Sequence, residues 1–129
     1  NADYTPNTEE LKANFKKVTE EIHKGNIVSA YAIGFGGVAE AVAKMSFGND
    51  IGFKFNADAN LKQIFGYNYG AFVIELKGDA VVENAIELGY TTADQTISFG
   101  SDSVTLDALK KGYEDKLEPV FNLKFILSL

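Results

Sequence analysis

The stretch that decides the fold of this chain is VSAYAIGFGGVAEAVAKMSFGNDIGFKF, residues 28–55. An apolar run leads into the glycine turn Gly34–Gly37, which opens directly onto an alanine-rich segment that predicts a helix. Gly48 should end this helix, and the alternation in Ile51–Phe55 predicts a strand with one buried face. The first N–H groups of a helix lack partners within the helix and lie at the positive end of its dipole. The glycine turn is therefore either a place of close helix–strand packing or a cradle for an anion.

The composition predicts one globular domain. Of the 129 residues, 46% are hydrophobic, with ten Phe and six Tyr to fill a core. The formal net charge is −6, and no run of Lys or Arg would attract nucleic acid or an anionic membrane. Cysteine is absent, which excludes disulfides and thiolate chemistry and agrees with a cytoplasmic location. No apolar stretch approaches the roughly 20 residues that a membrane-spanning helix needs.

The domain boundaries are predicted from the two ends of the chain. The first residue is Asn1 rather than Met, and we interpret residues 1–6 as a tag remnant or linker. We expect a single domain in which residues 7–121 fold and residues 122–129 form an apolar tail. We also expect the chain to be a piece of a larger enzyme, so that it can carry half of a site.

Periodicity and capping predict further helices. Asn7 or Thr8 should cap a helix over about residues 8–24, in which Lys16–Glu20 and Lys17–Glu21 pair on the wet side. Its apolar positions should form one buried stripe, Leu11, Phe15, Val18 and Ile22. Further helices are expected from Asp58 or Ala59 to Phe65, over 80–88 with Asp79 as the cap, and from Leu106 to 116 or 117.

Strands are predicted between these helices. Residues 27–33 are apolar enough to be buried on both faces, and residues 71–76 form a second strong candidate. Shorter strands are expected at 90–92, 96–99 and 104–105, and the tail can add an edge strand or pack elsewhere. The order of elements predicts a layered α+β fold, with a mixed β-sheet covered by helices on at least one face.

No set of residues suggests catalysis or metal binding, so we expect no catalytic residue and no metal site. His23 is the only histidine and should lie at the surface. The side chains of Ser29 and Ser46 have no evident base. The remaining acidic candidates stand at predicted turns, helix starts or wet helix faces, where capping or solvation is the usual role: Asp58, Asp79, Asp94, Asp102, Asp107, Glu114 and Asp115.

Three phrases in sequence order carry a resemblance to a known family. They are SAYAIGFGGV at 29–38 with MSFGN at 45–49, IFG at 64–66 with GAFVIE at 70–75, and SVTLDAL at 103–109 with LEPVF at 117–121. Together they resemble the C-terminal domain shared by aminoimidazole ribonucleotide synthetase and its relatives. Within that superfamily the chain looks most like a domain of phosphoribosylformylglycinamidine synthase, an ATP- and glutamine-dependent ligase (amidotransferase) of purine biosynthesis.

The chain differs from the family mainly at positions where the family has polar residues. Members typically read S-A-H-D-x-S-D-G-G-L in the first phrase, whereas this chain has Tyr31 and Ala32 for His and Asp. Gly34 and Phe35 likewise replace Ser and Asp. In the second phrase, the usual Glu, Ser and Arg are replaced by Tyr67, Asn68 and Ala71.

The resemblance implies a degenerate, non-catalytic copy from the large, duplicated form of the synthase. Gly34, Gly36 and Gly37 would be the remnant of a phosphate- or nucleotide-binding turn. Contact with another domain is expected from Tyr31, Phe35, Tyr67 and Tyr69. The resemblance also implies that ATP and magnesium serve the parent enzyme and not this chain, and that its partners are the other domains, the glutaminase domain among them.

Two other hypotheses remain open. The chain can be a stand-alone interaction module that uses the Tyr67–Tyr69 loop and the apolar tail as its contact surface. It can also be a degenerate domain from another branch of the superfamily, such as hydrogenase maturation or selenophosphate synthetase.

Overall fold

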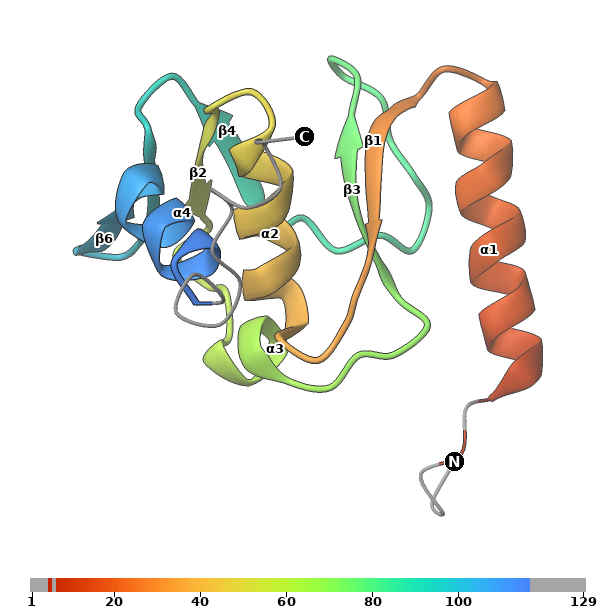
Figure 1. The fold of residues 1–129 in the computed structure, drawn as a ribbon. Coiled ribbons are helices and arrows are strands. Elements are labelled where there is room, and N and C mark those ends of the chain that lie inside the picture. Colours follow the sequence, from red (N-terminus) through yellow and green to blue (C-terminus); the bar gives the residue numbers. More distant parts are fainter. Residues whose placement is uncertain (1–4, 6, 117–129) are drawn as a thin grey trace, which may run out of the picture.

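The computed structural model describes residue 5 and residues 7–116 of the chain (Figure 1). The expected linker at 1–6, apart from Thr5, and the apolar tail at 122–129 lie outside the described residues. In order, the elements are α1 (Thr8–His23), β1 (Ile27–Ala32), α2 (Gly37–Phe47), β2 (Gly52–Phe55), α3 (Leu61–Phe65), β3 (Phe72–Leu76), β4 (Gly89–Thr92), β5 (Thr96–Phe99), β6 (Asp102–Thr105) and α4 (Leu106–Glu114).

The predicted α+β class is confirmed, but the described strands form two sheets instead of one. β1 and β3 pair antiparallel, with Ala30 opposite Ile74. The second sheet has the order β4-β2-β5-β6 and is mixed, because β2 runs parallel to β5 and antiparallel to β4. Periodicity predicts that a segment is a strand but not which strand lies beside it.

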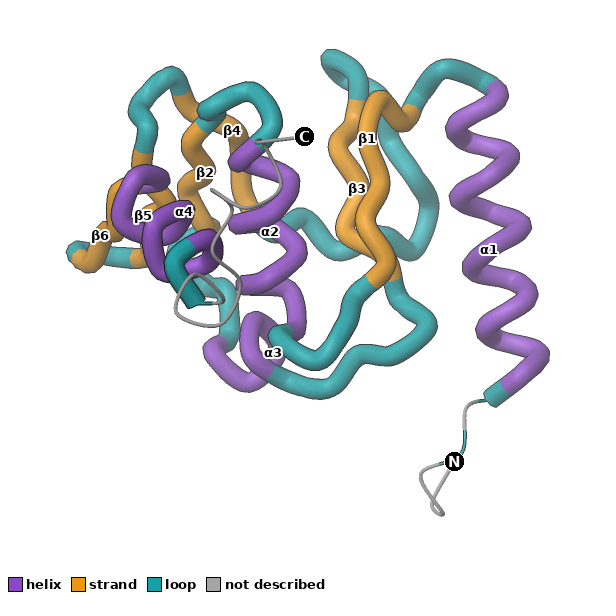
Figure 2. The backbone as a smooth tube through the Cα atoms, viewed as in Figure 1, coloured by secondary structure: helices purple, strands orange, loops and turns teal. Residues whose placement is uncertain are grey.

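Helix α2 joins the two sheets into one core. It contacts β1 and β3 of the first sheet and β2 of the second, and Figure 2 shows it between the two sheets in this view. Its inner face consists of Val38, Ala41 and Val42, which are buried, and of Met45, which is partly buried. The rest of the buried cluster comes from the neighbouring elements: Ile33, Phe55, Ile64 and Val73.

The predicted buried stripe of α1 is wrong, because Leu11 and Val18 are only partly buried and the other two residues are exposed. Asn7 does cap the helix, since its side chain accepts hydrogen bonds from the N–H groups of Glu9 and Glu10. Phe15 packs edge to face on Phe72 at a centroid distance of 4.9 Å, yet Phe15 and Ile22 both remain exposed. A sheet of two strands is too narrow to cover the whole apolar stripe of a four-turn helix.

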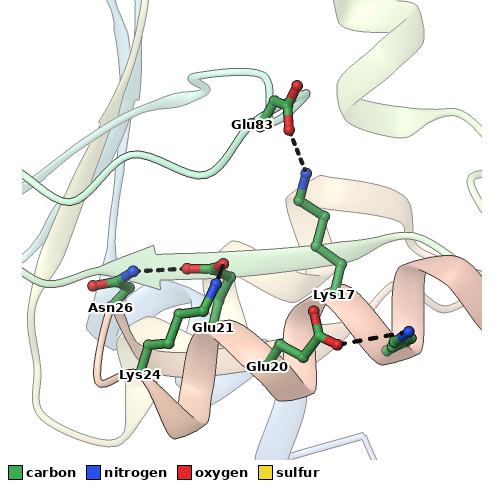
Figure 3. A network of polar contacts seen from close by, with 7 residues as sticks. Lys17, Glu20, Glu21, Lys24, Asn26 and Glu83 are labelled. Atoms are coloured by element: carbon green, nitrogen blue, oxygen red, sulfur yellow. Dashed lines mark hydrogen bonds and ion pairs between the residues drawn. The ribbon is translucent and has the colours of Figure 1, made fainter.

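A polar network fastens the C-terminal end of α1 (Figure 3). Glu21 is buried and its carboxylate accepts hydrogen bonds from Lys24 Nζ and Asn26 Nδ2, each at 2.7 Å. These two bonds hold the pKa of Glu21 below its usual value, the bond from Lys24 first. Lys17 Nζ lies 3.8 Å from Glu83 Oε2 in the 77–88 segment. A Lys17–Glu83 ion pair therefore replaces the predicted Lys17–Glu21 pair. The predicted Lys16–Glu20 pair is present at 3.8 Å.

The helix predicted over 80–88 is not formed. This segment has turns at 78–79 and 83–84, Asn84 adopts a left-handed φ of 64°, and Val81 and Ile86 are 83% and 73% exposed. Asp79 therefore caps no helix. The segment must travel from β3 in one sheet to β4 in the other, and extended chain covers about 3.3 Å per residue against about 1.5 Å in a helix.

Smaller corrections concern β1 and α3. β1 alternates between covered and exposed residues, with Ile27 buried and Val28 exposed, so it is not buried on both faces. This follows from its place in a sheet of only two strands. α3 begins after Asn60, whose side chain accepts from the N–H of Lys62, so the cap is Asn60 and not Asp58.

Candidate functional site

At the glycine turn, the side chain of Glu40 caps the start of α2. Gly36 is the N-cap residue of α2 and has no side chain with which to cap it. Glu40, one turn into the helix, bends back so that Oε2 accepts a hydrogen bond from the Gly36 N–H at 2.8 Å. A free backbone N–H at a helix start is the group that would bind an anion. Here the chain's own carboxylate occupies that N–H.

The last glycine of the turn, Gly37, lies where two helices touch. Its φ is +67°, a left-handed conformation that favours glycine. A Cβ at this position would lie 2.7 Å from the carbonyl oxygen of Ile64 and 3.0 Å from that of Gly66. The start of α2 and the end of α3 therefore approach through their backbones. Close packing accounts for glycine at position 37 without any ligand.

Lys44 extends the same network across three elements. Its Nζ donates to Glu40 Oε1 at 2.6 Å and lies 6.0 Å from the ring centre of Tyr31 on β1 and 5.3 Å from that of Tyr113 on α4. Rings at such distances attract a cation through their π faces. The hydrogen bond with Glu40 and then the one with Tyr31 raise the pKa of Lys44 well above its usual value. Glu40 and Lys44 are four residues apart on one helix, so the spacing alone indicates their pair. Nothing local in the sequence relates Tyr113 of α4 to α2.

The Glu40 network predicts a pH-dependent stability. The pKa of Glu40 is held below its usual value of 4.5, by the hydrogen bond from Lys44 first and by that from the Gly36 N–H second. A carboxyl with a lowered folded-state pKa stabilises the fold above its unfolded-state pKa, and this contribution is lost as the pH falls through the folded-state pKa. We expect Glu40→Gln to lower the free energy of unfolding by about 1 kcal/mol at neutral pH, since the helix loses a charged cap and a screened ion pair.

Urea denaturation of the wild type and the variant across the acid range tests this expectation. The difference between them should be constant at neutral pH and should shrink as the pH falls below 4.5, the usual Glu40 value. Glu114→Gln, at an exposed carboxylate near the end of α4, is the control and should change stability by less than about 0.5 kcal/mol. A Glu40→Gln difference that persists unchanged in acid would contradict the role of the charge.

Three of the four predicted contact aromatics meet in a single surface cluster, which we call the aromatic row. It consists of Phe35, Tyr67 and Tyr69, which are 76%, 70% and 62% exposed. The rings of Phe35 and Tyr67 have centroids 5.8 Å apart, and Tyr67 stacks on Tyr69 at 6.1 Å with an angle of 13°. The structure does not place Tyr31 in this row, since its ring lies instead against Lys44 and is partly buried.

The remaining predicted residues lie apart from the turn. His23 and Glu114 are exposed, and Ser46 is buried within α2. Among the described residues, no three His, Asp or Glu side chains gather closely enough to hold a metal ion. In the same part of the chain, no helix is both long and apolar enough to cross a membrane.

The chain is a small α+β domain. At the start of its central helix, α2, the Gly36 N–H is bonded to the carboxylate of Glu40, and the exposed aromatic row lies beside this turn. By sequence, this domain is similar to part of a synthase subunit.

The similar proteins are phosphoribosylformylglycinamidine synthase subunits PurL. In Picrophilus torridus the similarity is 37% identity over 89 residues, which is 64% of this chain and 12% of the relative's length. In two strains of Lactobacillus delbrueckii subsp. bulgaricus it is 24% identity over 117 residues, which is 83% of this chain and 16% of the relative. The chain thus spans less than a fifth of the length of these relatives. No protein-family model and no solved structure matches it.

Proposed function

We propose that this chain is a domain of a phosphoribosylformylglycinamidine synthase in purine biosynthesis, and that it is a structural copy without catalytic activity. The similarity to PurL subunits supports the parent enzyme. In that parent, an ATP-dependent carbon–nitrogen ligase, ATP and magnesium would serve a catalytic copy elsewhere in the polypeptide. The present copy would help to hold the cytoplasmic enzyme together.

The main support for a structural role is the hydrogen bond that the Gly36 N–H donates to Glu40 Oε2 at 2.8 Å. A phosphate at this helix start would have to displace a carboxylate that is also bonded to Lys44. It would find no polar side chain at positions 34 and 35, which are Gly and Phe. Anion binding by Gly34, Gly36 and Gly37 stays a prediction, and the competition with Glu40 argues against it.

The aromatic row supports contact with other domains of the parent. Three large rings that are each more than half exposed form one continuous surface across the turn and the 66–70 loop. Exposed apolar surface of this kind marks an interaction site more often than a free surface. We propose that this row packs on a neighbouring domain of the synthase, where stacked tyrosines would supply large contact area.

Calorimetric titration of the chain with ADP and magnesium tests the non-catalytic role. We expect no binding tighter than a Kd of about 1 mM, which corresponds to about −4 kcal/mol. Glu40→Ala frees the Gly36 N–H and serves as the matched variant. Micromolar binding by the wild type would overturn the argument that Glu40 keeps an anion from the turn. ATP hydrolysis that depends on formylglycinamide ribonucleotide and glutamine would overturn the proposed non-catalytic role.

The native polypeptide tests the choice of parent. The protein isolated from its source should have several times the 14.0 kDa mass of this chain. It should also contain the remaining synthase domains. A native protein near 14.0 kDa would instead support an interaction module that uses the same aromatic row.

A further inference from the structure

A cleft of about 650 Å³ separates the two sheets. Its lining includes Val42, Met45 and Ser46 of α2 together with Val73–Leu76 of β3 and Gly89–Thr91 of β4. Most of the 78–88 segment that connects β3 to β4 also lines it. The residues from each strand are consecutive. Because successive side chains of a strand point to opposite faces, a cleft that touches consecutive residues runs along the edge of the strand and not over its face.

Both of these edges lack a partner strand within the described residues. There β3 pairs only with β1, and β4 pairs only with β2. A strand edge presents a row of N–H and C=O groups that template pairing with another strand. The side chains around the cleft are mainly apolar, so an extended apolar segment with one smooth face would fit it better than a polar ligand.

The sequence of the chain contains such a segment. Between Val120 and Leu129 the odd positions are all large and apolar: Phe121, Leu123, Phe125, Leu127 and Leu129. The positions between them are Asn122, Lys124, Ile126 and Ser128. This period of two, interrupted at Ile126, predicts a strand with one buried face. The segment lies outside the described residues.

The described chain ends on the side of α2 that faces away from the cleft. Tyr113, in the last turn of α4, packs on Phe47 at a centroid distance of 5.9 Å and lies against Lys44. The residues of α2 that line the cleft, Val42, Met45 and Ser46, lie on the opposite face of the helix. The four residues from Lys116 to Val120 can span about 13 Å when extended. This span is comparable with the diameter of a helix, about 10–12 Å, so the segment can pass the end of α2 to reach the cleft.

We propose that Val120–Leu129 enters this cleft as a strand between β3 and β4, with its odd-numbered apolar side chains against α2. It would pair with both edges and join the two sheets into one. This inference uses only the cleft and the sequence, so it is independent of the proposed synthase function.

Hydrogen exchange of the full chain and of a chain truncated after Glu118 tests the proposal. We expect those amides of Val73–Leu76 and Tyr90–Thr91 that do not face β1 or β2 to exchange at least about tenfold faster in the truncated chain, because they lose hydrogen-bonded protection. The amides of the β5–β6 pair, which lies away from the cleft, serve as the internal control. Equal protection of the β3 and β4 amides in both chains would overturn the proposal.

Two point variants keep the test valid if the truncated chain does not fold. Phe125→Ser removes an apolar side chain from the odd face and should reproduce the faster exchange of β3 and β4. Lys124→Ser, one residue away on the even face, should leave exchange unchanged. Equal effects of the two variants would contradict the strand arrangement.

The mass in solution distinguishes the source of the strand. We expect the full chain to be monomeric by light scattering at concentrations where β3 and β4 are protected. Protection that appears only with a dimeric mass would assign the cleft to a second copy and overturn the proposal.

Discussion

Replacing Gly37 with alanine is expected to lower the free energy of unfolding by about 3 kcal/mol. A left-handed conformation costs a residue with a side chain about 1–2 kcal/mol, and overpacking adds about 1–3 kcal/mol. At Gly37 both terms apply, because its φ is +67° and the new Cβ would meet the carbonyl oxygen of Ile64 at 2.7 Å. Backbone atoms of α3 cannot rotate away as a flexible side chain would. Urea denaturation followed by circular dichroism measures the loss.

Gly25→Ala is the matched control for this prediction. Gly25 also has a positive φ, of +78°, but a Cβ there would have no heavy atom within 4 Å. It should therefore lose only the conformational part, about 1 kcal/mol. Equal losses at the two positions would show that close packing of α2 on α3 is not what requires glycine at position 37. The packing explanation of the turn would then be withdrawn.

Leu106→Ala is expected to cost about 3 kcal/mol, within the usual range of about 2–5 kcal/mol for a buried leucine. Leu106 is 1% exposed and is the largest fully buried side chain among the described residues. It stands where β6 passes into α4, and its N–H donates to the carbonyl of Gln95 at 3.0 Å. The truncation would leave a cavity at the junction that holds α4 to the second sheet. Thermal or urea unfolding measures the effect.

Leu61→Ala provides the comparison for Leu106. Leu61 is 55% exposed at the first position of α3, so its truncation removes little buried surface. We expect a change of less than about 0.5 kcal/mol. A Leu106 variant as stable as the Leu61 variant would mean that α4 does not depend on this anchor.

Local signals predicted most of the individual elements. The helix expected at 8–24 forms as Thr8–His23, since Asn7 caps it with short-range hydrogen bonds that depend only on neighbouring residues. The glycine turn and α2 appear as expected for the same reason. The prediction failed over 80–88, where an apolar pattern typical of a helix was overruled by the distance between β3 and β4.

In the candidate site, too, contacts within one helix could be predicted, whereas contacts between distant segments could not. Glu40 and Lys44 are four residues apart on one helix, so their pairing could be predicted from the sequence. The contact of Tyr113 with Lys44 joins α4 to α2, and the meeting of Phe35 with Tyr67 joins the turn to the 66–70 loop. Such contacts depend on how helices and loops are placed in space. No period or cap in the sequence encodes them.

The sequence by itself determined the class of the fold, the first helix with its N-terminal cap, and the glycine turn, because these depend on backbone conformation and on residues within one or two turns of each other. Only the tertiary structure decided that the strands form two sheets, that Glu40 closes the helix start at Gly36, and that three aromatic rings meet at the surface. These features depend on packing between segments far apart in the chain, where many arrangements satisfy the same local pattern.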